Sequence, residues 1–302
     1  MRRASEPWLR ALAASLGALD PDPRGSAQRV QQLLLLDHWR RAAAAGGPLP
    51  AFEDVGFRAF SQNDEDGVLL FVFALVGFES RVAVEIAASD GIECNSTNLI
   101  VNHGFTGLLV DSDPALLEQG RQFYRRRLSA AALQPRLIEG WVTRDNVNAL
   151  LREPMFPGER LAAGEVDLLS LDLDGNDWWV LQALELRPRV IVLEFNAALG
   201  AERALTIPYD PAFRARLEPI PYAGASLPAF VALLRPRGYR LVGVERQGFN
   251  AVFVRNDLAS VALPERTAAE CLDGPTVRIL QAGLRADPRL TQELLRRPWV
   301  EV

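Results

Sequence analysis

The chain has 302 residues, 49% of them hydrophobic, so it can form one large globular domain with additions or two small domains. A net charge of −5 and an isoelectric point near 5.3 argue against a nucleic-acid groove as its main function. Two cysteines, Cys94 and Cys271, imply no disulfide framework, so we expect a protein of the reducing cytoplasm.

The first residues have the pattern of a helical extension. Residues 6–18 and 26–45 carry apolar side chains at helical spacing, and Gly46, Gly47 and Pro48 end the second stretch. The first stretch is too short to span a bilayer and lacks a convincing cleavage site, so we expect neither a membrane anchor nor a signal peptide.

Strands and helices alternate after a polar loop at 51–67 and a helix at 68–76. The expected strands lie near 82–87, 107–111, 137–142, 166–172, 189–195, 239–245 and 250–255, and the expected helices near 95–103, 114–125, 145–151, 177–184 and 226–236. This alternation predicts a doubly wound α/β fold with a mostly parallel sheet. Residues 246–249 are too few for a parallel crossover, so the last two strands should form an antiparallel hairpin.

Three regions follow from this pattern. We expect a helical N-terminal extension at 1–50, the α/β domain at 51–260 and a helical C-terminal extension at 261–302. The sequence contains no internal repeat and no low-complexity tract.

The first strand of the α/β domain ends in a turn of small and acidic residues. The turn has one glycine, Gly91, flanked by Asp90 and preceded in the strand by Glu85. A dinucleotide site would need more glycines, and acidic residues are unsuited to phosphate. They suit an ammonium group, such as the methionyl end of S-adenosylmethionine. The alternative is a turn with capping residues and no ligand.

The second strand ends in Asp111, Ser112 and Asp113, and Pro114 opens the next helix. An acid at this place in an α/β sheet holds a ribose diol through two hydrogen bonds. Asp113 directly before proline is a good helix cap. We therefore expect Asp111 to hold ribose, with Ser112 beside it, and Asp113 to cap the helix.

Carboxylates gather after two later strands. Asp172, Asp174 and Asp177 follow one strand, and Glu194 and Asn196 end the next. Such carboxylates repel each other and raise one another's pKa unless a positive charge lies between them. Asp174, Glu194 and Asn196 would suit Mg²⁺ or Mn²⁺ as oxygen ligands, and the metal would acidify a substrate hydroxyl. Ordinary turn and cap chemistry stays open as the alternative.

Several segments together resemble the FkbM-like branch of S-adenosylmethionine-dependent methyltransferases, over roughly residues 57–256. The S-Q-N-x-E-D-G and D-x-D-G-N-D-x-W signatures are specific in combination. The resemblance implies the Rossmann-like class I methyltransferase fold and O-methylation of a sugar or secondary metabolite, as in natural product biosynthesis. The segments are "FSQNDEDGVL", "VEIAASDGIECNSTNLI", "LLVDSDP", "DLLSLDLDGNDWWVLQAL", "VIVLEFN" and "GASLPAFVALLRPRGYRLVG".

The resemblance also implies roles for individual residues, although Asp64 replaces the usual glycine of the first signature and Ser89 stands where a tryptophan is common. These departures leave the acceptor pocket open. The cofactor contacts implied are Gln62, Glu85, Ala87, Asp90, Gly91, Asp111, Ser112 and Asp172, and the loop over the site would contain Ser61, Gln62, Glu65 and Asp66.

Methyl transfer needs an aligned nucleophile and a proton acceptor. Only His38 and His103 could supply an imidazole, and His103 lies at the far edge of the predicted sheet. The catalytic candidates are therefore Asp172, Asp174 and Glu194, acting as a base or through a metal-bound alkoxide. A different reaction on the same cofactor and a non-catalytic scaffold both stay open. We expect a small-molecule acceptor as partner, no nucleic acid and no membrane, and leave a homo-oligomer open.

Overall fold

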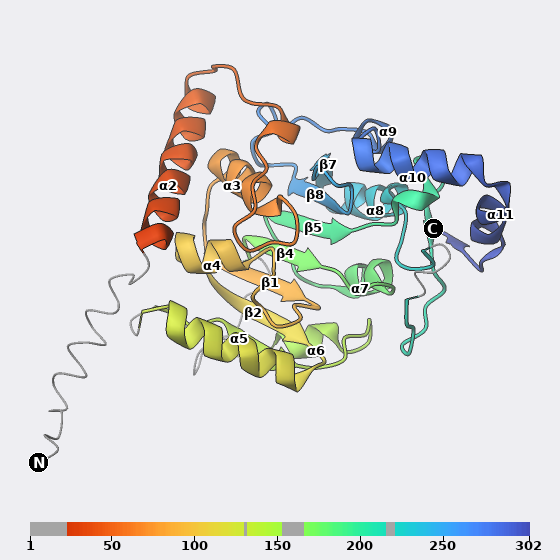
Figure 1. Ribbon diagram of the computed structural model, residues 1–302, viewed down its shortest axis with the longest axis horizontal. Coiled ribbons are helices and arrows are strands. Elements are labelled where there is room, and N and C mark those ends of the chain that lie inside the picture. Colours follow the sequence, from red (N-terminus) through yellow and green to blue (C-terminus); the bar gives the residue numbers. More distant parts are fainter. Residues whose placement is uncertain (1–22, 130–131, 153–165, 216–220) are drawn as a thin grey trace, which may run out of the picture.

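The computed structural model of the chain describes residues 23–129, 132–152, 166–215 and 221–302 (Figure 1). A seven-stranded sheet with the order β3-β2-β1-β4-β5-β8-β7 forms its centre. The helix predicted at 6–18 lies outside the described residues. The strands are β1 (Val82–Ile86), β2 (Thr106–Asp111), β3 (Arg136–Glu139), β4 (Leu168–Leu171), β5 (Val190–Glu194), β7 (Tyr239–Val244) and β8 (Asn250–Arg255).

The sheet has the predicted layout. The strands β1 to β5 pair in parallel, whereas β8 runs antiparallel to both β5 and β7. The predicted doubly wound sheet with a C-terminal antiparallel hairpin is therefore confirmed. A small second sheet of β6 (Leu205–Thr206) and β9 (Val300–Glu301) was not predicted, because strands this short leave no alternating pattern.

Helices cover both faces of the sheet (Figure 1). The helix α3 starts three residues before the predicted position, because the acidic Glu65 and Asp66 form its first turn. The helices are α2 (Pro23–Ala44), α3 (Glu65–Val76), α4 (Thr97–His103), α5 (Pro114–Arg127), α6 (Val147–Leu151), α7 (Asp177–Ala183), α8 (Leu227–Leu234), α9 (Ala268–Cys271), α10 (Pro275–Ala286) and α11 (Pro288–Arg296), with 3₁₀ turns η1 (Phe52–Asp54), η2 (Ala197–Leu199) and η3 (Arg235–Arg237).

Alternate side chains of each strand enter two separate cores. In β2, Leu108 and Val110 belong to the core that includes residues of α6, α7, α8 and α10, whereas Leu109 belongs to the core that includes residues of α2, α3, α4 and α5. Both faces are buried, so the strands appear in the sequence as continuous apolar runs rather than alternating ones. This burial leaves the strand ends as the places where polar groups meet solvent and ligands.

The C-terminal residues lie beside the carboxyl ends of the parallel strands. The arrowheads of β4 and β5 point toward the side of the molecule where α10 and α11 lie (Figure 1). Strand β9 pairs with β6, and Gln281 of α10 donates to the carbonyl oxygen of Ala197 in η2 at 2.7 Å. Elements of the predicted C-terminal extension therefore border the functional edge of the sheet.

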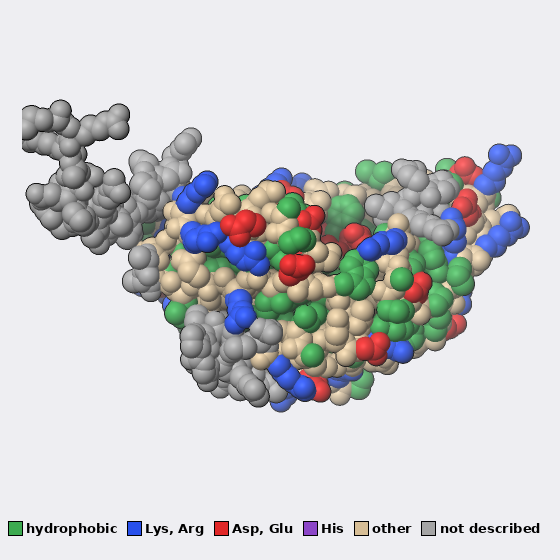
Figure 2. Space-filling view, turned by 90° about the horizontal axis from the view of Figure 1, so that it is seen from below, with side chains coloured by type: hydrophobic (Ala, Val, Ile, Leu, Met, Phe, Trp, Pro, Cys, Tyr) green, Lys and Arg blue, Asp and Glu red, His purple; other side chains and the backbone are tan. Residues whose placement is uncertain are grey.

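Charges are interspersed on the face shown in Figure 2, where arginine side chains alternate with acidic ones and do not form one patch. Among the described helices, none combines the length and apolar character that crossing a bilayer would require.

Candidate active site

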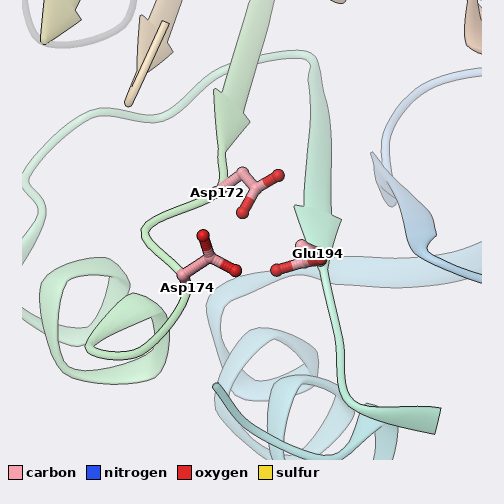
Figure 3. A group of neighbouring side chains, drawn as sticks. All are labelled: Asp172, Asp174 and Glu194. Atoms are coloured by element: carbon pink, nitrogen blue, oxygen red, sulfur yellow. The ribbon is translucent and has the colours of Figure 1, made fainter. Parts of the chain in front are cut away.

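Three carboxylates meet where β4 and β5 end. Asp172 directly follows β4, Asp174 lies in the loop to α7, and Glu194 is the last residue of β5. One oxygen of each lies within 4.8 Å of the other two, and the three side chains point toward one another (Figure 3). We call these residues the acidic trio. The sequence had predicted that the two strand ends lie side by side, and β4 and β5 are indeed neighbours.

Asp177 holds the loop that carries Asp174. Its carboxylate accepts hydrogen bonds from the backbone N–H of Leu173 at 2.6 Å and of Gly175 at 2.9 Å. The loop needs this support because Asp174 has a φ of 53°, in the left-handed region that costs energy for a residue with a side chain. Burial, and next the charge of Asp172, raises the pKa of Asp177 to about 7.

The acidic trio favours a proton or a cation. Burial raises the pKa of all three carboxyl groups, and the charge of Asp172 raises that of Glu194 further. Burial and the neighbouring charge of Asp172 make the protonated form of Glu194 the favoured one. Asp174, whose pKa is raised by burial alone, is then the member of the trio that is most readily available to a ligand.

A first cavity of about 120 Å³ lies at the ends of β1, β2 and β4. In the order of the sheet, the connection changes direction between β1 and β4, and ligands of open α/β sheets bind at this point. Ala87, Asp111 and Ser112 line the cavity together with Asp172 and Asp174. Its aromatic wall consists of Trp141 and Phe213.

Asp111 faces this cavity with a carboxylate that is already oriented by the backbone. It accepts hydrogen bonds from the N–H of Ser89 at 2.7 Å and of Asp113 at 3.0 Å. A carboxylate has about four acceptor sites, so two remain for a diol. Asp113 caps α5 by accepting from the N–H of Ala115 and Leu116, which confirms its predicted role.

The segment 207–214 lies over the first cavity and is fastened by side chains of the site. Trp141 donates to the carbonyl oxygen of Pro211 at 2.7 Å, and Asn176 donates to that of Asp210 at 2.7 Å. Trp179 donates to the carbonyl oxygen of Ile207 at 2.8 Å. The cavity is smaller than the roughly 300 Å³ at which typical ligand pockets begin. A nucleoside-sized ligand would therefore extend beyond the cavity as it stands.

A second cavity of about 240 Å³ lies on the other side of the acidic trio. Asp174 lines both cavities, and Glu194 lines only the second. Most of the wall of the second cavity is apolar and comes from β5, the β7–β8 turn and α10. The contributing residues include Phe195, Ala223, Phe249, Val277 and Leu280.

Some predicted cofactor contacts lie elsewhere. Glu85 is buried and accepts from the N–H of Asn95 at 2.9 Å and of Ser96 at 2.8 Å, so its carboxylate fixes the loop before α4. Asp90 accepts from two backbone N–H groups of its own turn. None of the four residues Gln62, Glu85, Asp90 and Gly91 lines the first cavity.

Gly91 serves the structure of this turn. It has a φ of 70°, which glycine adopts without strain, and its carbonyl oxygen accepts from the hydroxyl groups of Thr97 and Tyr124. Gln62 is exposed on the loop before α3. The turn after β1 therefore shapes the cavity through its backbone, and Ala87 is its predicted residue at the cavity wall.

Asn196, predicted as a metal ligand, stands apart from the acidic trio. Its side chain caps η2 by accepting from the N–H of Ala198, and it donates to the carbonyl oxygens of Pro221 and Ala223. The amide is thus occupied by backbone groups, although the residue lines the second cavity. The described residues bring Asp172 together with Asp174 and Glu194 instead.

The loop before α3 is built by its own carboxylates. Asp66 accepts from the N–H groups of Ala59, Phe60 and Ser61. Glu65 accepts from the side chain of Asn250 at 2.9 Å, and Asn250 pairs with Glu194 across the sheet. The signature carboxylates of this loop therefore fasten it beside the acidic trio.

Neither histidine lies at the site. His103 is buried at the end of α4, where its Nε2 lies 2.7 Å from the side-chain oxygen of Gln32 in α2. His38 is exposed on α2. The wall residues Trp141 and Phe213 were not predicted. Trp141 follows β3 closely, so the rule that ligands bind beyond strand ends could have identified it, whereas Phe213 comes from a long connection without a pattern.

No protein-family profile matches the chain, and no curated protein matches it in sequence. Solved structures are similar to it at low identity. An S-adenosylmethionine-dependent methyltransferase from Clostridium acetobutylicum ATCC 824 has 11% identity and a TM-score of 0.34, with 57% of this chain and 82% of that one covered.

Magnesium protoporphyrin IX methyltransferase from Synechocystis PCC 6803, solved with bound S-adenosylmethionine, has 13% identity and a TM-score of 0.35, covering 57% of this chain and 69% of that one. A TehB-like S-adenosylmethionine-dependent methyltransferase from Corynebacterium glutamicum ATCC 13032 has 13% identity and a TM-score of 0.33, with 75% of this chain and 98% of that one covered. At TM-scores this low, the matches carry no argument, and the fold rests on the topology of the sheet described above.

Proposed function

We propose that the chain is an S-adenosylmethionine-dependent methyltransferase that methylates a hydroxyl group of a small molecule. One observation carries this proposal. Two cavities meet at Asp174, at the carboxyl edge of a sheet in which Asp111 ends the second strand. Such a site has separate places for a nucleoside cofactor and an acceptor, with carboxylates at their junction.

The residues of the first cavity fit the cofactor. Asp111 offers two free acceptor sites to the ribose diol. Trp141 and Phe213 offer apolar surface to the adenine ring. The negative charge of Asp172 suits the ammonium group at the methionyl end. When bound, the cofactor would supply an electrophilic methyl group on a sulfonium centre.

On the acceptor side, Asp174 is the group that would remove the proton. It lines both cavities, so it can accept the hydroxyl proton while the acceptor oxygen faces the first cavity. Burial raises the pKa of this carboxyl above its ordinary value, which makes it a stronger base. Glu194, whose pKa is raised by burial and by the charge of Asp172, would be protonated and could hold the acceptor without competing for its proton.

A metal-assisted version of this reaction uses the same residues. Asp172, Asp174 and Glu194 offer three carboxylate oxygens within 4.8 Å, which suits Mg²⁺ or Mn²⁺. A bound cation would polarise the acceptor hydroxyl and lower its pKa. Glu194, whose pKa is raised by burial and by Asp172, would then have to lose its proton.

The wider predictions remain part of the proposal. Membership of the FkbM-like branch is supported by the D-x-D-G-N-D-x-W segment, because Asp174 lies at the junction of the cavities and Asp177 supports its loop. Asn176 and Trp179 of the same segment fasten the covering segment 207–214. Residues 51–260 would be the catalytic domain, with extensions at 1–50 and 261–302.

Calorimetric titration tests the cofactor. S-adenosylmethionine and S-adenosylhomocysteine should both bind with one site per chain. ATP should bind far more weakly, because its phosphates would face Asp172 and Asp174. Absence of S-adenosylmethionine binding would overturn the proposal. Binding without any S-adenosylhomocysteine formed over a broad acceptor panel would favour a different reaction on this cofactor.

A further inference from the structure

The second cavity is a built feature of the fold, because its outer wall is fixed. Val277 of α10 is 2% exposed and belongs to the same core as the strands of the sheet. It packs so closely on Gly248, in the β7–β8 turn, that a side chain at that glycine would collide with it. Gln281 fastens α10 to η2, as described above, and Thr276 donates to the side chain of Gln247 at 3.0 Å. These contacts hold α10 over the acidic trio.

The chemistry of the wall restricts what the cavity can bind. Apolar side chains from β5 and α10 surround most of the space, and Asp174 and Glu194 supply its charge at one end. None of the described residues that line the cavity is an arginine. An anionic ligand would therefore bring its charge to this acidic end with no cation among the described lining residues to offset it, which is unfavourable against a mostly apolar wall.

The volume sets the size of the ligand. An apolar cavity of about 150 Å³ is known to hold benzene. The second cavity measures about 240 Å³, so it accommodates a ring with a substituent. An apolar wall with one polar end binds a ligand whose body is apolar and whose heteroatom is oriented.

We propose that the second cavity is the acceptor site and that it takes a hydrophobic acceptor without negative charge, with its heteroatom at Asp174 and Glu194. Thr276, Val277 and Leu280 of α10 then determine which acceptors fit. This inference rests on the proposed methyltransferase function and narrows it. Of the two acceptor classes expected from the sequence, it favours a secondary metabolite with an apolar body over a sugar, and it excludes phosphorylated substrates.

Three small probes of similar size test the charge and polarity of the cavity. Benzyl alcohol, benzylamine and benzoate differ only in the group beside the ring. Ligand-observed nuclear magnetic resonance should detect the alcohol and the amine on the wild-type protein, and benzoate at least tenfold more weakly. Equal binding of benzoate would overturn the assignment of a non-anionic acceptor, because the carboxylates of the cavity should repel it.

A matched pair of variants tests the location. Leu280→Trp should fill the cavity and weaken benzyl alcohol binding at least tenfold, whereas Ile279→Trp, at a neighbouring position of α10 that is 74% exposed, should leave it unchanged. If Leu280→Trp does not fold, Thr276→Phe is the alternative variant that fills the cavity. Unchanged affinity in a folded cavity-filling variant would overturn the location.

If the methyltransferase proposal is wrong but the second cavity is a binding site, the same variants give a different result. Both tryptophan variants should keep the wild-type affinity for S-adenosylmethionine, because α10 contributes no residue to the first cavity. Probe binding that Leu280→Trp abolishes, in a protein that does not bind S-adenosylmethionine, would keep the second cavity as a binding site and reject the methyltransferase assignment.

Discussion

Asp111 and Asp113 lie two residues apart, yet their carboxylates have different partners. The carboxylate of Asp113 accepts hydrogen bonds from the first turn of α5, whereas that of Asp111 keeps two acceptor sites free at the cavity wall. The sequence favoured Asp111 for ribose and Asp113 for the helix cap. The structure separates them by the direction of each side chain, and this difference can be measured.

Asp111→Ala should weaken S-adenosylmethionine binding by about 2–3 kcal/mol, because the ribose diol loses charge-assisted hydrogen bonds. Asp113→Ala should leave that affinity nearly unchanged and lower the free energy of unfolding by about 1 kcal/mol through loss of the helix cap. Calorimetry and urea unfolding measure the two quantities. Unchanged cofactor affinity in Asp111→Ala would remove this residue from the ribose role.

Whether the acidic trio binds a divalent cation can be tested with the ion alone. If the acidic trio binds a cation, Mn²⁺ titrated into the protein should give one site by electron paramagnetic resonance, and binding should strengthen with pH as the carboxyl groups lose protons. Asp174→Asn and Glu194→Gln should each weaken this site at least tenfold, because both keep the shape and remove a charge. Glu118→Gln, on the exposed face of α5, is the control.

In the same experiment, EDTA should stop turnover and leave S-adenosylmethionine binding largely intact, because the proposed ribose and adenine contacts, Asp111, Trp141 and Phe213, lie outside the acidic trio. Absence of a Mn²⁺ site, with full activity in EDTA, would contradict the metal-assisted version. Asp174 would then be left as the general base, and the rate should rise with pH through an apparent pKa above that of a free carboxyl group.

The residues at strand ends were predictable, and the residues that surround them were not. Asp111 and Asp174 follow apolar runs, so their position at the carboxyl edge follows from sheet geometry. Glu85 was predicted as a cofactor contact because an acid inside a strand looks functional, and the structure shows its carboxylate accepting from backbone N–H groups of the loop before α4. Phe213 and Leu280 reach the site only through tertiary packing, which leaves no local pattern.

At the scale of elements, the approach of α5 to the first turn depends on one glycine. A side chain at Gly120 would collide with the carbonyl oxygen of Asp90 and with Leu137. Gly120→Ala should therefore lower the free energy of unfolding by about 1–3 kcal/mol. Gly283→Ala in α10, with nothing within 4 Å, should raise it by about 0.5–1 kcal/mol. Urea unfolding measures both, and equal effects would contradict the close packing of α5.

The helix α2 is joined to α4 through a polar cluster. The side-chain oxygen of Gln32 accepts from Asn98 at 3.0 Å and lies 2.7 Å from Nε2 of His103, which must carry the proton to donate. Burial, and next the positive charges of Arg29 and other arginines, lowers the pKa of His103 to about 4. The folded protein therefore keeps this imidazole neutral in moderately acidic solution.

This cluster should make stability depend on pH. Below its ordinary pKa of 6.5 the unfolded chain protonates His103, whereas the folded protein does so only near 4, so stability falls as the pH falls between these values. Its contribution should fall by about 2 kcal/mol between pH 7 and pH 5. His103→Gln keeps a donor for Gln32 and should lose this dependence. Equal pH slopes for the two proteins in urea unfolding would contradict the assignment.

Element boundaries followed from the sequence wherever periodicity was strong. The hairpin of β7 and β8 was predictable because four residues cannot form a crossover. The β6–β9 pair was not, because its strands come from distant parts of the chain and have two residues each. The C-terminal helices were expected as appendages, yet sequence alone could not place α10 against the acidic site.

At the scale of the whole molecule, the C-terminal helices share a core with the sheet. Cys271 and Val277 pack in one cluster with Val84 of β1 and Phe253 of β8. The residues on the opposite face, such as Leu109, form the second core around the same strands. Because one sheet separates and supports both cores, loss of packing on either face weakens the same structure.

We therefore expect the extension at 261–302 to unfold together with the α/β domain. Leu109→Ala should lower the free energy of unfolding by about 2–5 kcal/mol, and Val277→Ala by about 1–3 kcal/mol. Both should shift one transition that far-ultraviolet circular dichroism and tryptophan fluorescence report at the same urea concentration. Ile279→Ala, at an exposed position of α10, should change stability by less than about 0.5 kcal/mol. A separate early transition that only Val277→Ala shifts would show that the extension folds independently, and α10 could not then hold a fixed wall of the acceptor cavity.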